Sequence, residues 1–394
     1  MVARKGYRKS IGLFDLVSFG LGGTIGSGIF IVPGIAAGIA GSSSIIAWLF
    51  ASLSASCVMY SLAKTSYKYP ATGAFYHLFS KVFGKRISIS LVILYTVSSV
   101  FGISTIASGI GQYIFSFGIH DTELILLVEI CIIAAFCLMN IKGLYLSGKT
   151  EIILTIAKIL PIIILSALLL PFLNESNFHP FYPSSNFDFL KAIVIVYWCF
   201  TGFEIAALFS YETKGGQKIV YRSLKIVIAI TISVYIFLNI SLIGSVGSYV
   251  LANSPAPLAT AYGLIIKDSN IVVGIIGIIA MLSAINAYIA GTSRVLQNIS
   301  YQLRLPILKD LTSSATPLVA TTIVAIISIL LLFISNKFAE LASISVIIIL
   351  LPYFFICISA YKIFFDDYKT RLISSIGASS VFLIFAIYFI SPFF

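Results

Sequence analysis

Residues 22–34 read GGTIGSGIFIVPG, which places several glycines, a serine and a proline inside an otherwise apolar segment. Each glycine inside a helix costs about 1 kcal/mol of helix stability relative to alanine, so this composition is unfavourable for a continuous helix. We therefore predict a helix that breaks near the middle of a membrane. A break frees backbone N–H and C=O groups, which lipid cannot satisfy and which must face a cavity or a ligand. The segment is therefore a candidate binding site.

The composition of the whole chain indicates a membrane protein. Of its 394 residues 59% are apolar and 10% are charged, and the mean hydropathy is +1.07. A soluble protein would carry about 25% charged residues. Apolar runs long enough to cross a bilayer recur along the sequence. We predict an all-α membrane protein with about eleven spans, at residues 12–40, 45–67, 87–117, 123–141, 150–171, 190–212, 226–247, 271–301, 317–335, 338–361 and 372–392.

The distribution of basic residues predicts the orientation of these spans. If the spans alternate, 21 of the 25 lysines and arginines fall in segments on the same side as the N-terminus. Only Lys191, Lys267 and Lys337 fall on the other side. The positive-inside rule then places the N-terminus in the cytoplasm, and an odd number of spans places the C-terminus outside. The net charge of +11 is explained by anionic lipid headgroups in the cell membrane and requires no nucleic acid.

Cysteine and histidine spacing predicts neither a disulfide framework nor a metal site. All five cysteines fall inside predicted spans, and the three histidines lie in or beside loops without metal-ligand spacing. We expect no cofactor.

Charged residues inside the predicted spans are few, and Glu204 and Lys158 lie deepest. An ionisable group inside a bilayer costs several kcal/mol, so it usually faces a cavity, a partner or a transport path. Glu129 lies nearer the outer end of its span, where its carboxylate is expected to reach the interface. Lys158 has two interpretations. It could form a buried ion pair or a hydrogen bond to an opened helix, or it could act in coupling or gating, which we favour.

A second interrupted segment, YWCFTGFE at residues 197–204, lies five spans after the first. Close packing of helices through the GxxxG pattern Gly22–Gly26 would explain the first segment but not the second. Two interrupted helices in corresponding positions predict an inverted repeat with substrate bound between the breaks. We predict one transmembrane domain over residues 1–394, with repeats at about 12–171 and 190–361 and an extra helix at 372–392.

These segments together resemble the amino acid–polyamine–organocation (APC) family of permeases, which has the five-plus-five inverted repeat of the LeuT type with discontinuous helices 1 and 6. The resemblance runs from about Leu13 to Tyr361. Many members of the family have twelve helices, whereas we expect eleven here. Its motifs are GGTIGSGIFIVPG, YPATGAFY at 69–76, NIKGLYLSGKTEIILTIAKILP at 140–161, YWCFTGFE, SAINAYIAGTSRVL at 283–296 and TP at 316–317.

The resemblance implies a substrate site formed by the two breaks. The backbone N–H groups of Ser27 and Gly28 match positions that bind a substrate carboxylate, as a helix N-terminus can. The carbonyls of Thr24, Trp198 and Thr201 match positions that receive the α-ammonium group. The full set of expected substrate contacts is Thr24, Ile25, Gly26, Ser27, Gly28, Trp198, Cys199, Phe200, Thr201 and Gly202.

The resemblance also implies gates on either side of this site. Tyr95, Glu204 and Tyr353 match residues of the inner gate. Trp198 matches an aromatic residue that closes over the substrate from outside, and Tyr288 matches one beneath the pocket.

Lys158 matches a fifth-helix lysine whose amine lies between helices 1 and 8, where related sodium-coupled proteins hold a cation. The resemblance therefore implies sodium-independent transport, with Lys158 either carrying a proton or remaining charged as a fixed strut.

We predict a secondary active transporter for amino acids that is coupled to protons and works by alternating access. Its expected partners are an amino acid, which we expect to be neutral, together with protons and membrane lipids. An amino acid or polyamine exchanger of the same fold and a transporter-like nutrient sensor are the alternatives. We do not expect an enzyme, since the spans carry no HExxH motif and no paired aspartates.

Overall fold

The fold is built almost entirely from helices. The computed structural model describes residues 9–69, 75–181, 188–266, 269–308 and 311–390. Within these ranges no strand is present, and extended pairing is limited to one isolated bridge between Ile11 and Thr213. The predicted all-α class is confirmed. The central residues of the YPATGAFY motif, 70–74, and the chain end, 391–394, lie outside the described residues.

The helices follow the predicted spans in order. The first half contains α1 (Leu13–Thr24), α2 (Ser27–Ala40), α3 (Ser44–Lys68), α4 (Phe75–Ser116), α5 (Thr122–Lys142) and α6 (Leu144–Leu168). The second half contains α7 (Asp188–Trp198), α8 (Ile205–Leu208), α9 (Gln217–Ala252), α10 (Pro257–Ile265), α11 (Ser269–Leu303), α12 (Leu318–Ile334) and α13 (Phe338–Ile363). The extra helix is α14 (Tyr368–Ile390).

The first predicted break is confirmed between α1 and α2. Ile25 and Gly26 leave the helical conformation, with φ/ψ of −90°/81° and −125°/−133°. Gly26 is also a point of close approach, because a Cβ at this position would lie 2.7 Å from the Cβ of Ala284 in α11. The glycines therefore allow the helix to break and also allow α11 to pack closely against the break.

The second predicted break is confirmed between α7 and α8. Residues 199–204 form turns, and Gly202 adopts the left-handed φ of 96°, which favours glycine. A Cβ at Gly202 would lie 2.5 Å from the carbonyl oxygen of Gly23. The two interrupted helices therefore touch backbone to backbone.

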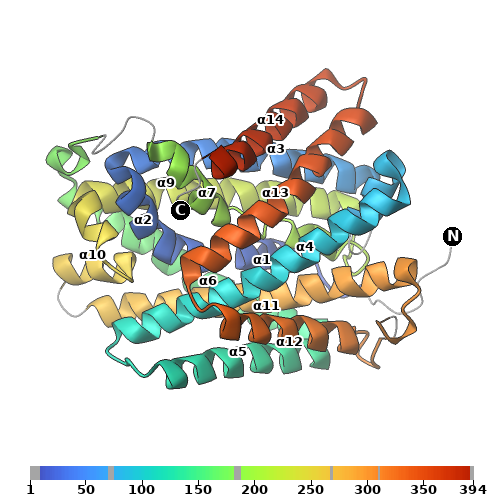
Figure 1. Ribbon diagram of the computed structural model, residues 1–394, viewed down its shortest axis with the longest axis horizontal. Helices are drawn as coiled ribbons and strands as arrows, with labels where there is room; N and C mark the ends of the chain where they lie inside the picture. The colour runs from blue at the N-terminus through green and yellow to red at the C-terminus, as the bar shows by residue number, and fades with distance from the viewer. Residues whose placement is uncertain (1–8, 70–74, 182–187, 267–268, 309–310, 391–394) are drawn as a thin grey trace.

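The broken helices lie inside the bundle. In Figure 1, α5 and α12 run along one side and α3 and α14 along the opposite side, with α1 between them. The first broken helix packs against α6, α9 and α11, while α2 and α7 pack against each other. This arrangement gives the breaks protein neighbours on every side, as freed backbone groups in a membrane require.

The number of membrane crossings stays a prediction. Among the described residues, eight helical stretches are long and apolar enough to cross a bilayer, and the first of them, Leu13–Lys68, covers two predicted spans. The α12 helix is apolar but has only 17 residues. The predicted span 190–212 is divided between α7 and α8, which are too short individually.

The corner before α14 is held by Asp367. Its carboxylate accepts hydrogen bonds from the Thr370 hydroxyl (2.7 Å) and the Thr370 backbone N–H (3.1 Å), and it pairs with Lys64 of α3 (3.1 Å). These contacts lower the pKa of Asp367 from 3.8 to about 2, and the hydrogen bond from the Thr370 hydroxyl has the largest effect. The carboxylate therefore anchors the start of α14 to α3.

A lowered carboxyl pKa stabilises the folded state above its unfolded value of about 4, and this contribution is lost as the pH falls towards 2. We expect Asp367→Asn to melt at a lower temperature than wild type at pH 7. The difference should shrink as the pH falls from about 4 to about 2. Melting temperatures of both proteins across this range check the prediction, and a difference that does not depend on pH would contradict it.

Candidate functional site

The break in the first helix presents unpaired polar groups. Ser27 and Gly28 open α2, and the first amide N–H groups of a helix have no acceptor within it. The Ser27 hydroxyl is buried and has no hydrogen-bond partner among the described residues. Because a buried polar group without a partner costs about 1–3 kcal/mol, this point is suited to an anionic group of a ligand.

The second break lies directly against the first. A Cβ at Gly28 would lie 2.7 Å from the sulfur of Cys199, so these residues pack with no space between them. Phe200 points away, into an aromatic cluster with Trp48 and Tyr235. Cys199 and Phe200 are both expected substrate contacts on the second break. Cys199 lies against the first break, whereas the ring of Phe200 packs in the aromatic cluster.

Tyr235 of α9 joins the two breaks, and the sequence analysis did not identify it. Its hydroxyl lies 2.7 Å from the carbonyl oxygen of Thr24 and 2.9 Å from that of Cys199, and it can donate to either. The Trp198 carbonyl accepts from both the backbone N–H and the hydroxyl of Thr201. Several of the carbonyls freed by unwinding are thus already hydrogen-bonded in this conformation.

Removing the Tyr235 hydroxyl should leave both breaks with poorer hydrogen bonding. We expect Tyr235→Phe to lower the free energy of unfolding by about 1–3 kcal/mol, because buried carbonyls lose their donor. The matched control is Tyr262→Phe, since the buried Tyr262 hydroxyl has no partner among the described residues. Melting of the two variants is the measurement, and equal losses would contradict the bridging role.

Two of the predicted inner-gate residues, Glu204 and Tyr353, are in direct contact. The Tyr353 hydroxyl donates a 2.6 Å hydrogen bond to Glu204, and the Gly202 backbone N–H donates a second at 3.1 Å. The ring of Tyr353 stacks on Phe203 with centroids 5.4 Å apart. Tyr95 is fully buried and its ring packs against Phe75.

Tyr288 of α11 contacts the second break at Thr201. Its hydroxyl lies 3.1 Å from that of Thr201, and its ring packs beside Trp198 against Gly102 of α4. Trp198 and Tyr288 are each 4% exposed, so the space between the breaks is closed to solvent in this conformation.

Lys158 of α6 contacts the first break and α11 at once. Its ammonium donates to the carbonyl oxygens of Ile25 (2.7 Å) and Gly22 (3.2 Å) and to the Ser283 hydroxyl (2.8 Å). An ammonium has three protons to donate, and all three are used. The hydrogen bond to an opened helix that the sequence suggested is therefore present.

Glu151 is the buried counter-charge of this lysine, and the sequence analysis missed it. Its carboxylate accepts from the Ser283 hydroxyl (2.5 Å) and from the Asn286 amide (2.6 Å). Ser283 thus accepts a hydrogen bond from Lys158 while donating one to Glu151. Glu151 precedes Lys158 by seven residues, or two helical turns, and this spacing on one face was the signal available in the sequence.

The Glu151 carboxylate also explains why residue 22 is a glycine. A Cβ at Gly22 would overlap the carboxylate of Glu151 and lie 3.3 Å from the Ser283 hydroxyl. Gly22 therefore makes room for a charged network and not only for a neighbouring helix.

A buried ion pair lies at the end of the bundle that the charge distribution predicts to face the cytoplasm. Arg294 of α11 binds Glu212 through two hydrogen bonds of 2.9 and 3.2 Å, and both side chains are at most 3% exposed. The backbone N–H groups of Ser10 and Ile11 donate to the Glu212 carbonyl. The N-terminal segment, the end of the sixth predicted span and α11 are therefore locked together.

The fold is that of a helical membrane protein of the LeuT type. Over 99% of this chain and 100% of the other, the fold matches that of MhsT in complex with L-phenylalanine, with a TM-score of 0.71 and 14% identity. At this identity the likeness is one of fold.

Residues 11–394 match the model of the family described as “Amino acid permease”. The chain belongs to this family, and it is an amino acid transporter and not an enzyme. The inner membrane transport protein YbaT of Escherichia coli (strain K12) is 27% identical over 384 residues, which cover 95% of this chain and 89% of that protein. The serine/threonine exchanger SteT of Bacillus subtilis (strain 168) is 24% identical, covering 88% and 82%.

Proposed function

We propose that this protein is a sodium-independent, proton-coupled symporter of neutral amino acids that works by alternating access in the cell membrane. The observation that carries the proposal is the Lys158 ammonium, which holds the Gly22 and Ile25 carbonyls of the broken helix. Freed carbonyls at such a break are ligands for a coupling cation in transporters of this architecture. A protonated amine supplies the same positive charge without a metal ion.

The network around Lys158 supports a proton as the coupling ion. Lys158, Ser283 and Glu151 form a continuous hydrogen-bonded chain, so a proton leaving the amine has a carboxylate acceptor one hydroxyl away. Loss of the proton would weaken the hydrogen bonds from Lys158 to the carbonyls of the first break. Protonation and the geometry of the substrate site are thereby linked.

The surroundings of the breaks support a neutral amino acid. Ser27 and Gly28 offer donors for the α-carboxylate, and the facing surface comes from Cys199 and other small or apolar groups. Two relatives carry names with neutral substrates, SteT and the branched-chain amino acid permease BcaP of Bacillus subtilis (strain 168), which is 24% identical and covers 71% of this chain and 63% of that protein.

Exchange of amino acids is the second candidate. It is favoured by the three hydrogen bonds that satisfy the Lys158 ammonium, since a fully bonded amine can serve as a fixed strut. SteT, an exchanger by name, is among the relatives.

Uptake into proteoliposomes tests the proposal. The purified protein is reconstituted in sodium-free buffer and offered a panel of radiolabelled amino acids with and without an inward proton gradient. Accumulation above equilibrium that requires the gradient is expected. Uptake that instead requires amino acid inside the vesicle would overturn symport in favour of exchange.

A further inference from the structure

Glu129 is a buried carboxylate without a partner. It lies in α5, two turns after the start of that helix at Thr122, and it is 0% exposed. Neither carboxylate oxygen has a hydrogen-bond partner among the described residues. The buried carboxylates of Glu151, Glu204 and Glu212 each accept hydrogen bonds. The helices around Glu129 enclose its side chain, and its position at the membrane interface stays a prediction.

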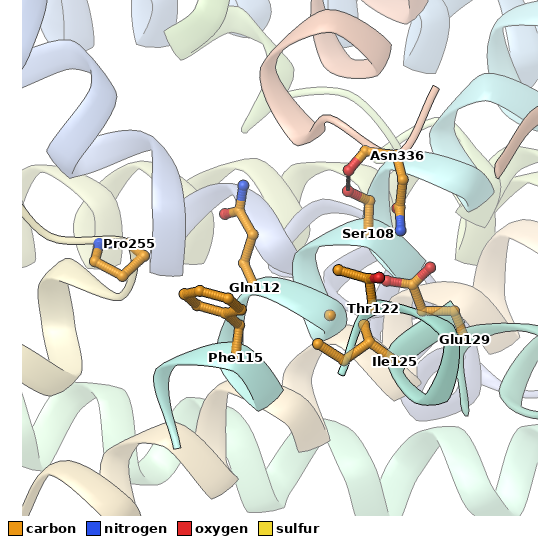
Figure 2. A pocket seen from close by; sticks show the side chains of 9 residues that line it. Ser108, Gln112, Phe115, Thr122, Ile125, Glu129, Pro255 and Asn336 are labelled. Carbon is orange, nitrogen blue, oxygen red and sulfur yellow. Dashed lines mark hydrogen bonds between the residues drawn. The ribbon is translucent and has the colours of Figure 1, made fainter. Parts of the chain in front are cut away.

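The Glu129 side chain lines a cavity of about 220 Å³ at the end of the bundle that is predicted to face outside. Figure 2 shows the carboxylate between Asn336 and Thr122, with Ser108 and Gln112 on the facing helix α4. The rim residues Phe115 and Thr122 are exposed, so the cavity has a route to solvent.

The packing leaves room for this carboxylate because α4 has a glycine, and therefore no side chain, at the point of contact. A Cβ at Gly111 would overlap one Glu129 oxygen and would lie 2.9 Å from the side chain of Ile125. Gly111 therefore allows the carboxylate to lie against α4, in the wall of the cavity.

The charges around the cavity favour a cation. None of the residues that line it is basic. Lys337 follows Asn336, but its ammonium pairs with the exposed Glu340 at 2.8 Å. His120 packs edge-on against Phe115 at the rim, while Asp121 and Glu123 at the start of α5 add negative charge. Among the described residues, the lining thus carries one carboxylate and no basic side chain.

The chemistry of the lining limits the size and charge of the ligand. One carboxylate with hydroxyl and amide oxygens is a set of hard donors suited to an alkali-metal ion or to an ammonium group. A divalent ion would be expected to recruit more than one carboxylate. An anion, or the carboxylate of an amino acid, would find no basic group here.

We propose that this cavity is a binding site for a small monovalent cation, either an alkali-metal ion or a primary ammonium, held by the Glu129 carboxylate. The site connects α4, α5, the segment before α10 at Pro255 and the segment before α13 at Asn336. Its occupant would cross-link these four elements. The proposal stands on this cavity alone and does not depend on how transport is coupled.

The test is the melting temperature of the purified full-length protein in sodium, potassium or methylammonium chloride, with N-methyl-D-glucamine chloride as the bulky reference at equal ionic strength. We expect at least one small cation to raise the melting temperature by about 2 °C or more in a saturable manner. The sodium and potassium arms report an inorganic ion, and the methylammonium arm reports an amine.

The variant Glu129→Gln should abolish this rise, whereas Asp366→Asn, which removes an exposed carboxylate from the segment between α13 and α14, should retain it. If Glu129→Gln does not fold, Gly111→Ala decides, because crowding the carboxylate should weaken the cation response. A wild-type protein that melts equally in all four salts would overturn the proposal. An unchanged response in Glu129→Gln, or in Gly111→Ala when that variant decides, would overturn it as well.

Discussion

Replacing Lys158 with alanine is expected to abolish accumulation of amino acid driven by a proton gradient. The variant removes the group that holds the Gly22 and Ile25 carbonyls, and it leaves the Glu151 carboxylate buried without its positive partner. Breaking a buried pair from one side costs about 3–5 kcal/mol, so the variant should also unfold more readily. Initial gradient-driven uptake should fall by at least about tenfold, which corresponds to about 1.4 kcal/mol.

Stability and coupling can be separated by a second variant. In Lys158→Met with Glu151→Gln, both charges are removed together, so no unpaired charge stays buried. We expect this protein to recover most of its melting temperature while uptake remains uncoupled from the gradient. Lys369→Ala, which removes an exposed lysine at the start of α14, should behave as wild type. Undiminished gradient-driven accumulation by Lys158→Ala would exclude a proton-carrying role for this residue.

Replacing Arg294 with methionine is expected to weaken the lock at the predicted inner end. The arginine binds Glu212 through two hydrogen bonds, caps the Ala290 carbonyl and lies over the Phe209 ring. Its loss leaves Glu212 buried and charged, and we expect the free energy of unfolding to fall by about 3–5 kcal/mol. Arg294→Lys should recover only part of this, because an ammonium cannot form the paired contact of a guanidinium.

The neutral pair again supplies the control. Arg294→Met with Glu212→Gln should regain most of the stability but should transport differently, because the lock would open without the separation of two charges. Melting temperature and uptake at the same protein density are the measurements. If Arg294→Met melts at the same temperature as the wild type, the ion pair contributes nothing to the stability of this end of the bundle, and the prediction is wrong.

The helix breaks could be predicted because their causes are local. The free-energy cost of glycine inside a helix can be read from the composition of one segment, and it implies freed backbone groups there. The spacing of the two interrupted spans can be read along the chain. The position of Lys158 could be predicted for a related reason, since a charge deep in an apolar run must contact something polar. The side chain that accepts a hydrogen bond from Lys158 could not be predicted, because Ser283 lies 125 residues away on another helix.

The sequence by itself determined that this protein is a bundle of membrane-spanning helices with two interrupted helices and a buried lysine, because apolar run length, glycine content and charge act within single segments. Only the tertiary structure decided that Ser283 lies between Lys158 and Glu151, that Tyr235 joins the two breaks and that Glu129 lines a cavity. The physical reason is that lipid-facing and protein-facing sides of such helices are almost equally apolar. Which helices become neighbours, and therefore which polar groups meet, is settled by packing between segments far apart in the chain.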